Sequence, residues 1–331
     1  MKIAIIGAGV AGLGAAADLK GKGHDVRLFD KGRGAGGRLS TRRASSPVGE
    51  LRFDHGAQFF TARDEGFRRL IERLETGGHV ARWSPRGAEI APGPDGWTTT
   101  MTTPEAADVW YVGAPSMNSI VKAMASGFDI SWGERAVEIE RRADGSHVRF
   151  DNAGRQGPFD AVILAIPAEQ AGELLEDISP ALADEAKAAT TAPCWAVMLA
   201  FAAPLETGWE AARINKAPLS WAACNASKPG RSGAQTWVLH ASPEWTREHV
   251  DMDKEDVAAA LTDVFCEMTG APRPVYLAAH RWLYAKTDVS AGSPFGWDDT
   301  RKIGVIGDWR IAPRVEAAWQ SGHALATFLA D

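Results

Sequence analysis

The chain has 331 residues, of which 45% are hydrophobic and 24% are charged, and its formal net charge is −6. These values are typical of a globular protein with one large domain or two smaller ones. The acidic balance argues against a general nucleic-acid-binding protein. No apolar stretch reaches membrane-spanning length, so we expect no membrane association.

Three cysteines, Cys194, Cys224 and Cys266, are too few and too scattered for a disulfide framework or a metal site. This usage fits a reduced, cytoplasmic setting. The apolar start "MKIAIIGAGVAG" does not indicate a signal peptide, because glycines interrupt it where an apolar core should continue.

The first thirty residues predict a βαβ unit. Residues 2–6 form a short apolar run that ends at glycine, which indicates a buried parallel strand. Residues 10–20 are alanine-rich and helical in pattern, and Gly21 and Gly23 end the helix. Residues 25–30, "DVRLFD", alternate into a second strand.

The turn inside this unit predicts a dinucleotide site. Gly7, Gly9 and Gly12 match the pattern G-x-G-x-x-G, in which the glycines allow a tight turn, a close pyrophosphate and close helix packing. The helix N-terminus then offers free N–H groups to the phosphates. Asp30 lies 18 residues beyond Gly12, close to the spacing of a ribose-binding acid.

A second glycine-rich loop, "GRGAGGR", follows Asp30 at residues 32–38. Two adjacent loops of this kind lay more main chain against one extended ligand. Arg38 is suited to pair with a phosphate, the alternative being a flexible, solvated loop. Arg42 and Arg43 are candidates for a substrate phosphate, the alternative being a solvated basic patch.

The middle of the chain is less regular. Residues 64–75 predict an amphipathic helix, and hairpins are expected around residues 93–99 and 143–145. Residues 160–167 indicate a buried strand closed by proline. From about residue 169 to 288, helical segments alternate with tryptophan-bearing strands.

The C-terminal part of the chain again shows the strand-and-helix pattern of the N-terminal part. Residues 302–309 predict a strand that ends in Gly-Asp, and a closing helix follows. The predicted fold class is therefore α/β: a Rossmann-like dinucleotide-binding domain, with a parallel sheet and a small antiparallel meander, and an inserted mixed α/β substrate domain. We expect the first domain to comprise residues 1–75, 105–168 and 290–331, and the second to comprise residues 76–104 and 169–289.

Asp30, the "GAGGR" segment and the late "GDW" resemble the FAD-binding flavoprotein oxidase family that includes amine oxidases. The resemblance implies that the backbone of Val137 lies near the adenine, that Asp308 binds the ribityl or pyrophosphate part, and that the helix near Val315 and Glu316 points its N-terminus at the flavin O2 edge. Such a helix end stabilises negative charge on a reduced flavin. The implied FAD-binding residues are Gly7, Gly9, Ala11, Gly12, Asp30, Lys31, Gly37, Arg38, Gln58, Val137, Asp308 and Val315. All cysteines precede Pro272, so we expect the FAD to be noncovalent.

Four separated phrases, "FDKGRGAGGRLSTRR", "FDHGAQFFTARD", "HRWLYA" and "GDW", are more narrowly similar to the renalase family. That resemblance implies oxidation of isomeric dihydronicotinamide dinucleotides to NAD(P)⁺, with electrons passing to FAD and then to oxygen to give hydrogen peroxide. The expected partners are these small molecules, and no nucleic acid or membrane.

Hydride transfer of this kind needs two aligned flat rings more than acid–base help. The candidate catalytic residues are Gln58, in a glycine-opened loop, His240, at the end of a tryptophan-bearing strand, and Trp282. The structural alternatives are a loop-stabilising hydrogen bond for Gln58 and core packing for His240 and Trp282.

Three other functions stay open. An amine oxidase or related desaturase commonly needs paired aromatics, often tyrosines, beside the flavin, and only Tyr111, Tyr276 and Tyr284 are present. A non-catalytic FAD-binding protein is compatible with the motifs, which report binding and not turnover. A nicotinamide-only dehydrogenase is the third.

Overall fold

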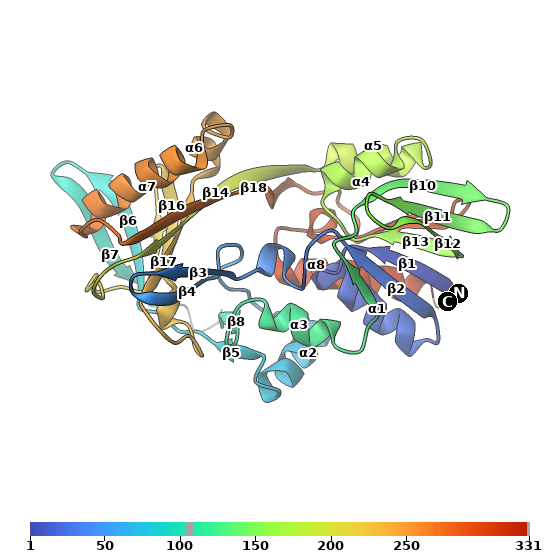
Figure 1. Cartoon of the computed structure of the whole chain (residues 1–331), viewed down its shortest axis with the longest axis horizontal. Coiled ribbons are helices and arrows are strands. Elements are labelled where there is room, and N and C mark those ends of the chain that lie inside the picture. The colour runs from blue at the N-terminus through green and yellow to red at the C-terminus, as the bar shows by residue number, and fades with distance from the viewer. Residues whose placement is uncertain (103–108, 330–331) are drawn as a thin grey trace.

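β1 (Lys2–Ile6) lies in a six-stranded sheet that organises one half of the molecule (Figure 1). The computed structural model describes residues 1–102 and 109–329. The strand order is β19-β20-β13-β1-β2-β9, with every pair parallel except β19 and β20. The other strands are β2 (Asp25–Asp30), β9 (Ile130–Trp132), β13 (Ala161–Leu164), β19 (Gly296–Asp298) and β20 (Ile303–Val305). This sheet takes its strands from both ends and the middle of the chain.

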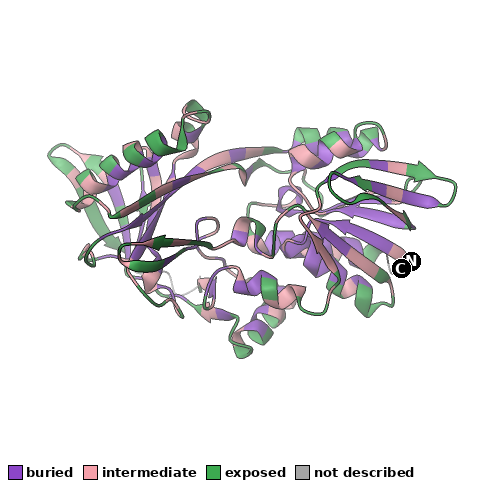
Figure 2. Ribbon diagram, in the orientation of Figure 1, coloured by how far each residue is buried: buried purple, intermediate pink, exposed green. Residues whose placement is uncertain are grey.

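Successive residues of β1 face opposite sides of the parallel sheet. Ile3 and Ile5 belong to a core shared with helices α1 (Val10–Gly21) and α8 (Val315–Phe328). Ala4 and Ile6 belong to a core on the other side. That side is covered by the antiparallel sheet of β10 (Ala136–Arg142), β11 (Gly145–Phe150) and β12 (Gly154–Phe159), and by helices α4 (Ala168–Leu175) and α5 (Pro180–Ala188). Figure 2 shows the resulting buried strands between exposed helix and hairpin surfaces.

A seven-stranded sheet forms the other half, in the order β18-β14-β17-β16-β15-β6-β7 (Figure 1). Trp237 packs with Leu261 and Phe265 of helix α7, whereas its neighbour Val238 packs on the opposite side with Phe53. The strands are β6 (Gly87–Gly93), β7 (Gly96–Thr102), β14 (Thr190–Ala200), β15 (Ala211–Ile214), β16 (Leu219–Cys224), β17 (Thr236–Ala241) and β18 (Tyr276–Val289); the covering helices are α6 (Pro243–Glu248) and α7 (Lys254–Thr269).

Short elements join the two halves. The long strands β14 and β18 pair along most of their length and reach from the seven-stranded sheet toward α4 and α5 (Figure 1). The remaining elements are η1 (Gly37–Leu39), β3 (Arg42–Ser46), β4 (Gly49–Phe53), α2 (Glu65–Thr76), β5 (Val80–Arg82), β8 (Tyr111–Gly113), α3 (Ser119–Ala125), η2 (Asn225–Ser227) and η3 (Asp308–Arg310). Among the described residues, no helix combines the length and apolar composition needed to cross a membrane.

The α/β fold class and the main local predictions are confirmed, including the βαβ start, the helix after Asp64 and both hairpins. Two segments pack differently from the predicted division. Helices α4 and α5 span residues 168–188, almost wholly within the predicted second domain, yet Ala171 and Leu175 share a buried core with Val162 of the parallel sheet. The hairpin β3–β4 lies before residue 75, yet it packs on the seven-stranded sheet. The predicted boundary between residues 104 and 105 lies outside the described residues.

Candidate active site

The glycines between β1 and α1 serve different purposes. Gly7 has a φ of +108°, and a Cβ there would lie 2.4 Å from the main-chain oxygen of Ala165. A Cβ on Gly12 would lie 2.0 Å from the oxygen of Gly7. Among the residues that the structure describes, none has an atom within 4 Å of a Cβ placed on Gly9, so the main chain is open there. Since α1 begins without a side-chain cap, the N–H groups of its first turn, which holds Ala11, are available to a phosphate.

Asp30 joins the two glycine-rich loops. Its Oδ2 accepts a hydrogen bond from the N–H of Ala8 (2.7 Å), and its Oδ1 accepts one from the N–H of Gly32 (2.7 Å). Its main-chain oxygen accepts a hydrogen bond from Glu134 (2.9 Å), just before β10. The carboxylate therefore holds the two glycine-rich loops together, and its contact with a ribose stays a prediction.

Lys31 and Val137 lie on either side of this junction. The Nζ of Lys31 donates a hydrogen bond to the Oε1 of Gln170 (3.1 Å). Burial, followed by the charge of Arg135, lowers the pKa of Lys31. Val137 lies at a register shift between β10 and β11, and its side chain is 36% exposed. A main chain without regular strand pairing suits the predicted backbone contact with adenine.

Arg38 and Asp308 bring the two ends of the chain together. The guanidinium donates two hydrogen bonds to the carboxylate, at 2.9 Å and 2.5 Å. Burial opposes the charge of Arg38, but the attraction of Asp308 outweighs it and raises the pKa of Arg38. Thr287 also donates a hydrogen bond to Asp308 (3.3 Å). Gly37 precedes Arg38 with a φ of +53°, and no atom lies within 4 Å of a Cβ placed there.

Helix α8 begins at Val315 without a side-chain cap. Glu316, which is buried, accepts hydrogen bonds from the main-chain N–H groups of Arg63 (2.5 Å) and Asp64 (2.6 Å). These bonds fix the start of α8 against the residues that precede α2. Uncapped N–H groups at a fixed helix N-terminus suit the predicted contact with a polarised flavin carbonyl.

The three predicted catalytic residues meet at one loop, residues 54–58. The Nε2 of Gln58 donates hydrogen bonds to the main-chain oxygens of Asp54 (2.5 Å) and Gly56 (3.0 Å). The indole of Trp282 donates one to the oxygen of His55 (3.0 Å), and the Nε2 of His240 lies 3.3 Å from the same oxygen. Ala57 in turn donates to the main-chain oxygen of Arg38 (2.9 Å), which links this loop to the second glycine-rich loop.

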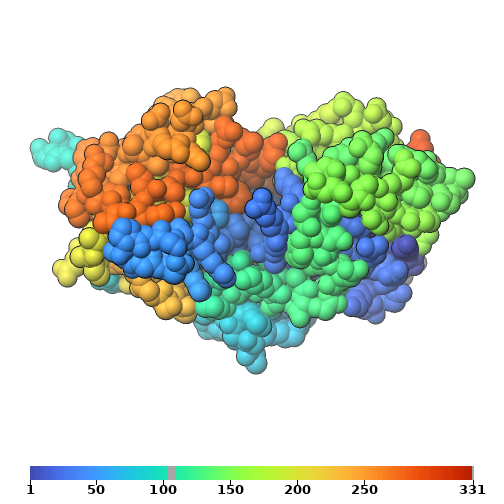
Figure 3. Space-filling view, viewed as in Figure 1, coloured from blue at the N-terminus to red at the C-terminus, as the bar shows by residue number. Residues whose placement is uncertain are grey.

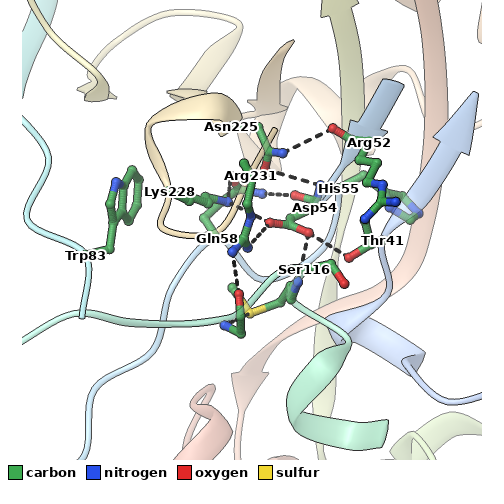
Figure 4. A network of polar contacts seen from close by, with 12 residues as sticks. Thr41, Arg52, Asp54, His55, Gln58, Trp83, Ser116, Asn225, Lys228 and Arg231 are labelled. Atoms are coloured by element: carbon green, nitrogen blue, oxygen red, sulfur yellow. Dashed lines mark hydrogen bonds and ion pairs between the residues drawn. The ribbon is translucent and has the colours of Figure 1, made fainter. Parts of the chain in front are cut away.

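A buried ionic cluster joins the first residue of this loop to the segment that follows η2 (Figure 4). We define this cluster as Asp54, Lys228 and Arg231. The carboxylate of Asp54 lies 2.5 Å from Arg231 and 3.6 Å from Lys228, and Thr41 donates a hydrogen bond to it (2.6 Å). Burial would raise the pKa of Asp54, but Lys228 and Arg231 bring it down to about 2. Burial lowers the pKa of Lys228 to about 8.

Aromatic side chains, including three histidines with lowered pKa values, lie in and around the same loop. The rings of His55, His280 and Trp282 contact one another, with centroid distances of 4.5–5.1 Å. Burial lowers the pKa of both His55 and His240 to about 4, and the pKa of His280 is lowered by burial and by Arg42. These imidazoles are therefore neutral near pH 7, while Arg42 supplies a cation close by.

The sequence did not point to Asp54, Lys228, Arg231, His55 or His280. The only available signal was the position of Asp54 and His55 directly before the glycine-opened loop. A pocket of about 420 Å³ lies beside α8; it is lined by residues that include Arg310, Trp319 and His323 and by none of the predicted catalytic residues.

The fold and the site define an α/β protein with a Rossmann-like half, whose second sheet brings aromatic side chains to the 54–58 loop. Residues 5–74 match an NAD(P)-binding Rossmann-like domain, and residues 97–303 match the family described as flavin containing amine oxidoreductase. The chain belongs to this flavin containing amine oxidoreductase family, whose description implies a flavin cofactor.

Solved structures show the same fold at 14% sequence identity. Cyclohexylamine oxidase from Brevibacterium oxydans IH-35A has a TM-score of 0.77 and a putative protoporphyrinogen oxidase from Exiguobacterium sp. 255-15 has one of 0.76; each comparison covers 99% of this chain and 98% of the other. A curated relative, 4,4'-diapophytoene desaturase from Staphylococcus aureus (strain Newman), is 55% identical over 40 residues. That match spans 12% of this chain and 8% of the desaturase.

The residues of this structure fit a flavin nucleotide. The open main chain at Gly9 and Gly37, the uncapped starts of α1 and α8 and the buried carboxylate of Asp308 offer contacts for phosphates, hydroxyls and a carbonyl.

Proposed function

We propose that this chain is an FAD-dependent, renalase-like oxidase that converts isomeric 2- or 6-dihydronicotinamide dinucleotides to NAD(P)⁺. The observation that carries the proposal is the neutral aromatic surface of His55, His240, His280 and Trp282 with Arg42 beside it. A flat dihydropyridine stacks on such rings, and its phosphates are attracted by the arginine. Bound FAD would accept the hydride and pass the electrons to oxygen, giving hydrogen peroxide.

The chain's own residues would align the substrate and exclude water. Trp282 and His240 are both anchored to the main-chain oxygen of His55, which fixes the planes of their rings. No proton needs to leave the ring carbon, because the ring nitrogen drives aromatisation. Neutral imidazoles suit this role, since a cation would oppose the positive charge that develops on the nicotinamide ring.

Noncovalent binding of FAD is part of the proposal. Cys194 pairs with Trp282 across β14 and β18, so it is the cysteine nearest in register to the aromatic surface. Burial raises the pKa of its thiol to about 12. A thiol that stays protonated is a poor nucleophile for attaching a flavin.

Oxidation of an amine is the second candidate, because the related structures include a cyclohexylamine oxidase and a putrescine oxidase. Two of the three tyrosines already stack on phenylalanines: Tyr111 on Phe60, and Tyr276 on Phe53.

Anaerobic titration of the purified protein tests the proposal. We expect a flavin absorption band that bleaches rapidly with 6- or 2-dihydro-NAD(P) and slowly with ordinary NADH. Acid precipitation should release the flavin. If no dihydronicotinamide isomer bleaches the flavin and a panel of amines yields peroxide, the amine oxidase function replaces the proposed one. Bleaching by neither class would favour a binding protein, and a colourless protein that takes up no FAD would favour a nicotinamide-only dehydrogenase.

A further inference from the structure

Lys228 is a buried lysine that the proposed reaction does not use. Its side chain is fully buried, on the segment that follows η2. The Nζ lies 3.2 Å from the Oε1 of Gln58, 3.6 Å from the Oδ2 of Asp54 and 5.4 Å from the centre of the Trp83 ring. These contacts hold one ammonium group between a carboxylate, an amide oxygen and an aromatic face (Figure 4).

The ionic cluster carries more positive than negative charge. Lys228 and Arg231 contribute two cations, whereas Asp54 contributes one carboxylate, and both Lys228 and Asp54 are fully buried. Arg231 takes the shorter contact with Asp54, at 2.5 Å. The ammonium of Lys228 therefore shares the carboxylate of Asp54 with Arg231, and the amide oxygen of Gln58 and the face of Trp83 supply its other contacts.

The same contact fixes the orientation of the Gln58 amide. The amide nitrogen faces the main-chain oxygens of Asp54 and Gly56, and the amide oxygen faces the ammonium. A half-turn of this amide would place its oxygen against two carbonyl oxygens and its NH₂ group against a cation. Three favourable contacts would become repulsive, so one orientation is selected as long as Lys228 is charged.

The amide of Gln58 stabilises the 54–58 loop through its hydrogen bonds to Asp54 and Gly56. The main-chain oxygen of His55, in the same loop, contacts two residues of the aromatic surface. Trp282 donates to that oxygen, and the Nε2 of His240 contacts it. We propose that Lys228 is a positioning residue which, through Gln58, holds the 54–58 loop and so aligns His240 and Trp282 with the nicotinamide ring. The alignment part of this inference depends on the proposed function, whereas the orientation of Gln58 does not.

Lys228→Met removes the ammonium and keeps an unbranched side chain, and Lys228→Gln restores an N–H donor. We expect Lys228→Met to shift and broaden the side-chain amide resonances of Gln58, which a Gln58→Leu variant identifies by their loss. We also expect the limiting rate of flavin reduction by 6-dihydro-NAD to fall about tenfold or more, the effect of losing one hydrogen bond that secures a reactive geometry. Lys228→Gln should restore most of the reduction rate and most of the wild-type character of the Gln58 resonances.

A double-mutant cycle separates this role from a general loss of stability. If Lys228 acts through Gln58, Lys228→Met should reduce the rate far less in a Gln58→Leu background than in the wild type. Lys187→Met is the matched control, because it removes another lysine ion pair, with Glu176, on the surface of α5. It should leave the Gln58 resonances and the reduction rate unchanged.

The pH dependence of the wild type gives a further measurement that needs no variant. The charged and titratable groups around Lys228 are Asp54, Arg231, Cys224 and His240, and burial brings the pKa of Lys228 down to about 8. The Gln58 amide resonances should therefore change as the pH rises through about 8 and lose this response in Lys228→Gln.

Additive effects in the cycle, or Gln58 resonances that stay unchanged in Lys228→Met and across this pH range, would overturn the proposal. If no dihydronicotinamide reduces the wild-type flavin, the proposed function fails, and the resonances of Gln58 still decide whether Lys228 orients its amide.

Discussion

Acidification should destabilise this protein mainly through two buried histidines at the candidate site. An unfolded chain protonates a histidine near pH 6.5, whereas His55 and His240 in the folded chain have pKa values of about 4. Between these values the unfolded chain binds more protons, so the free energy of unfolding falls as the pH falls. The contribution of the two histidines to the free energy of unfolding is retained above about pH 6.5.

The shift of each histidine corresponds to about 3 kcal/mol when fully developed, of which about 2 kcal/mol is lost on going from pH 8 to pH 5. The two groups together therefore remove about 4 kcal/mol, a large fraction of the stability of an ordinary domain. Asp54 adds little in this range, because its pKa of about 2 keeps it charged throughout.

Urea unfolding at both pH values, at matched flavin occupancy, measures this loss. His240→Gln should lose about 2 kcal/mol less than the wild type between pH 8 and pH 5, and His55→Gln/His240→Gln about 4 kcal/mol less. The comparison uses the change with pH, so a uniform loss of stability in a variant does not affect it. Variants with the same pH dependence as the wild type would refute the assignment of neutral, buried imidazoles.

The cofactor and substrate contacts make further predictions. Gly9→Ala should keep the melting temperature but weaken FAD binding about tenfold or more, because its Cβ meets only open space that the pyrophosphate would occupy. Gly12→Ala should instead destabilise the fold by about 1–3 kcal/mol, since its Cβ would meet the main chain, and thermal unfolding distinguishes the two. Asp308→Ala should weaken FAD binding about 10- to 100-fold in a fluorescence titration, and unchanged affinity would contradict its role. Arg42→Glu/Arg43→Glu should raise the KM for the dihydronicotinamide dinucleotide about tenfold and reduce its salt dependence, with kcat little changed.

The sequence by itself predicted the start of the Rossmann-like half, because the residues that define it lie close together in the chain. The tight turn at Gly7, the close packing at Gly12 and the acid at the end of β2 are each required within thirty residues, so spacing alone predicts them. The resemblance of "GAGGR" and "GDW" to flavoproteins predicted that Arg38 and Asp308 contact one ligand, and that contact stays a prediction. The structure joins the two side chains in an ion pair, which the sequence did not predict. Gln58, His240 and Trp282 likewise meet at one loop, although their catalytic roles remain predictions.

Tertiary structure alone decided the ionic cluster and the way the halves meet. Lys228 lies 170 residues from Gln58 and 174 from Asp54, and neither its neighbours nor their spacing distinguishes it from a surface lysine. Its burial depends on where the segment after η2 packs against a loop from the other half. The same holds for α4, α5 and the β3–β4 hairpin, whose partners are chosen by complementary apolar faces. Short-range patterns record which backbone conformation a residue favours, but contacts between distant segments depend on the shapes and charges that only the assembled fold brings together.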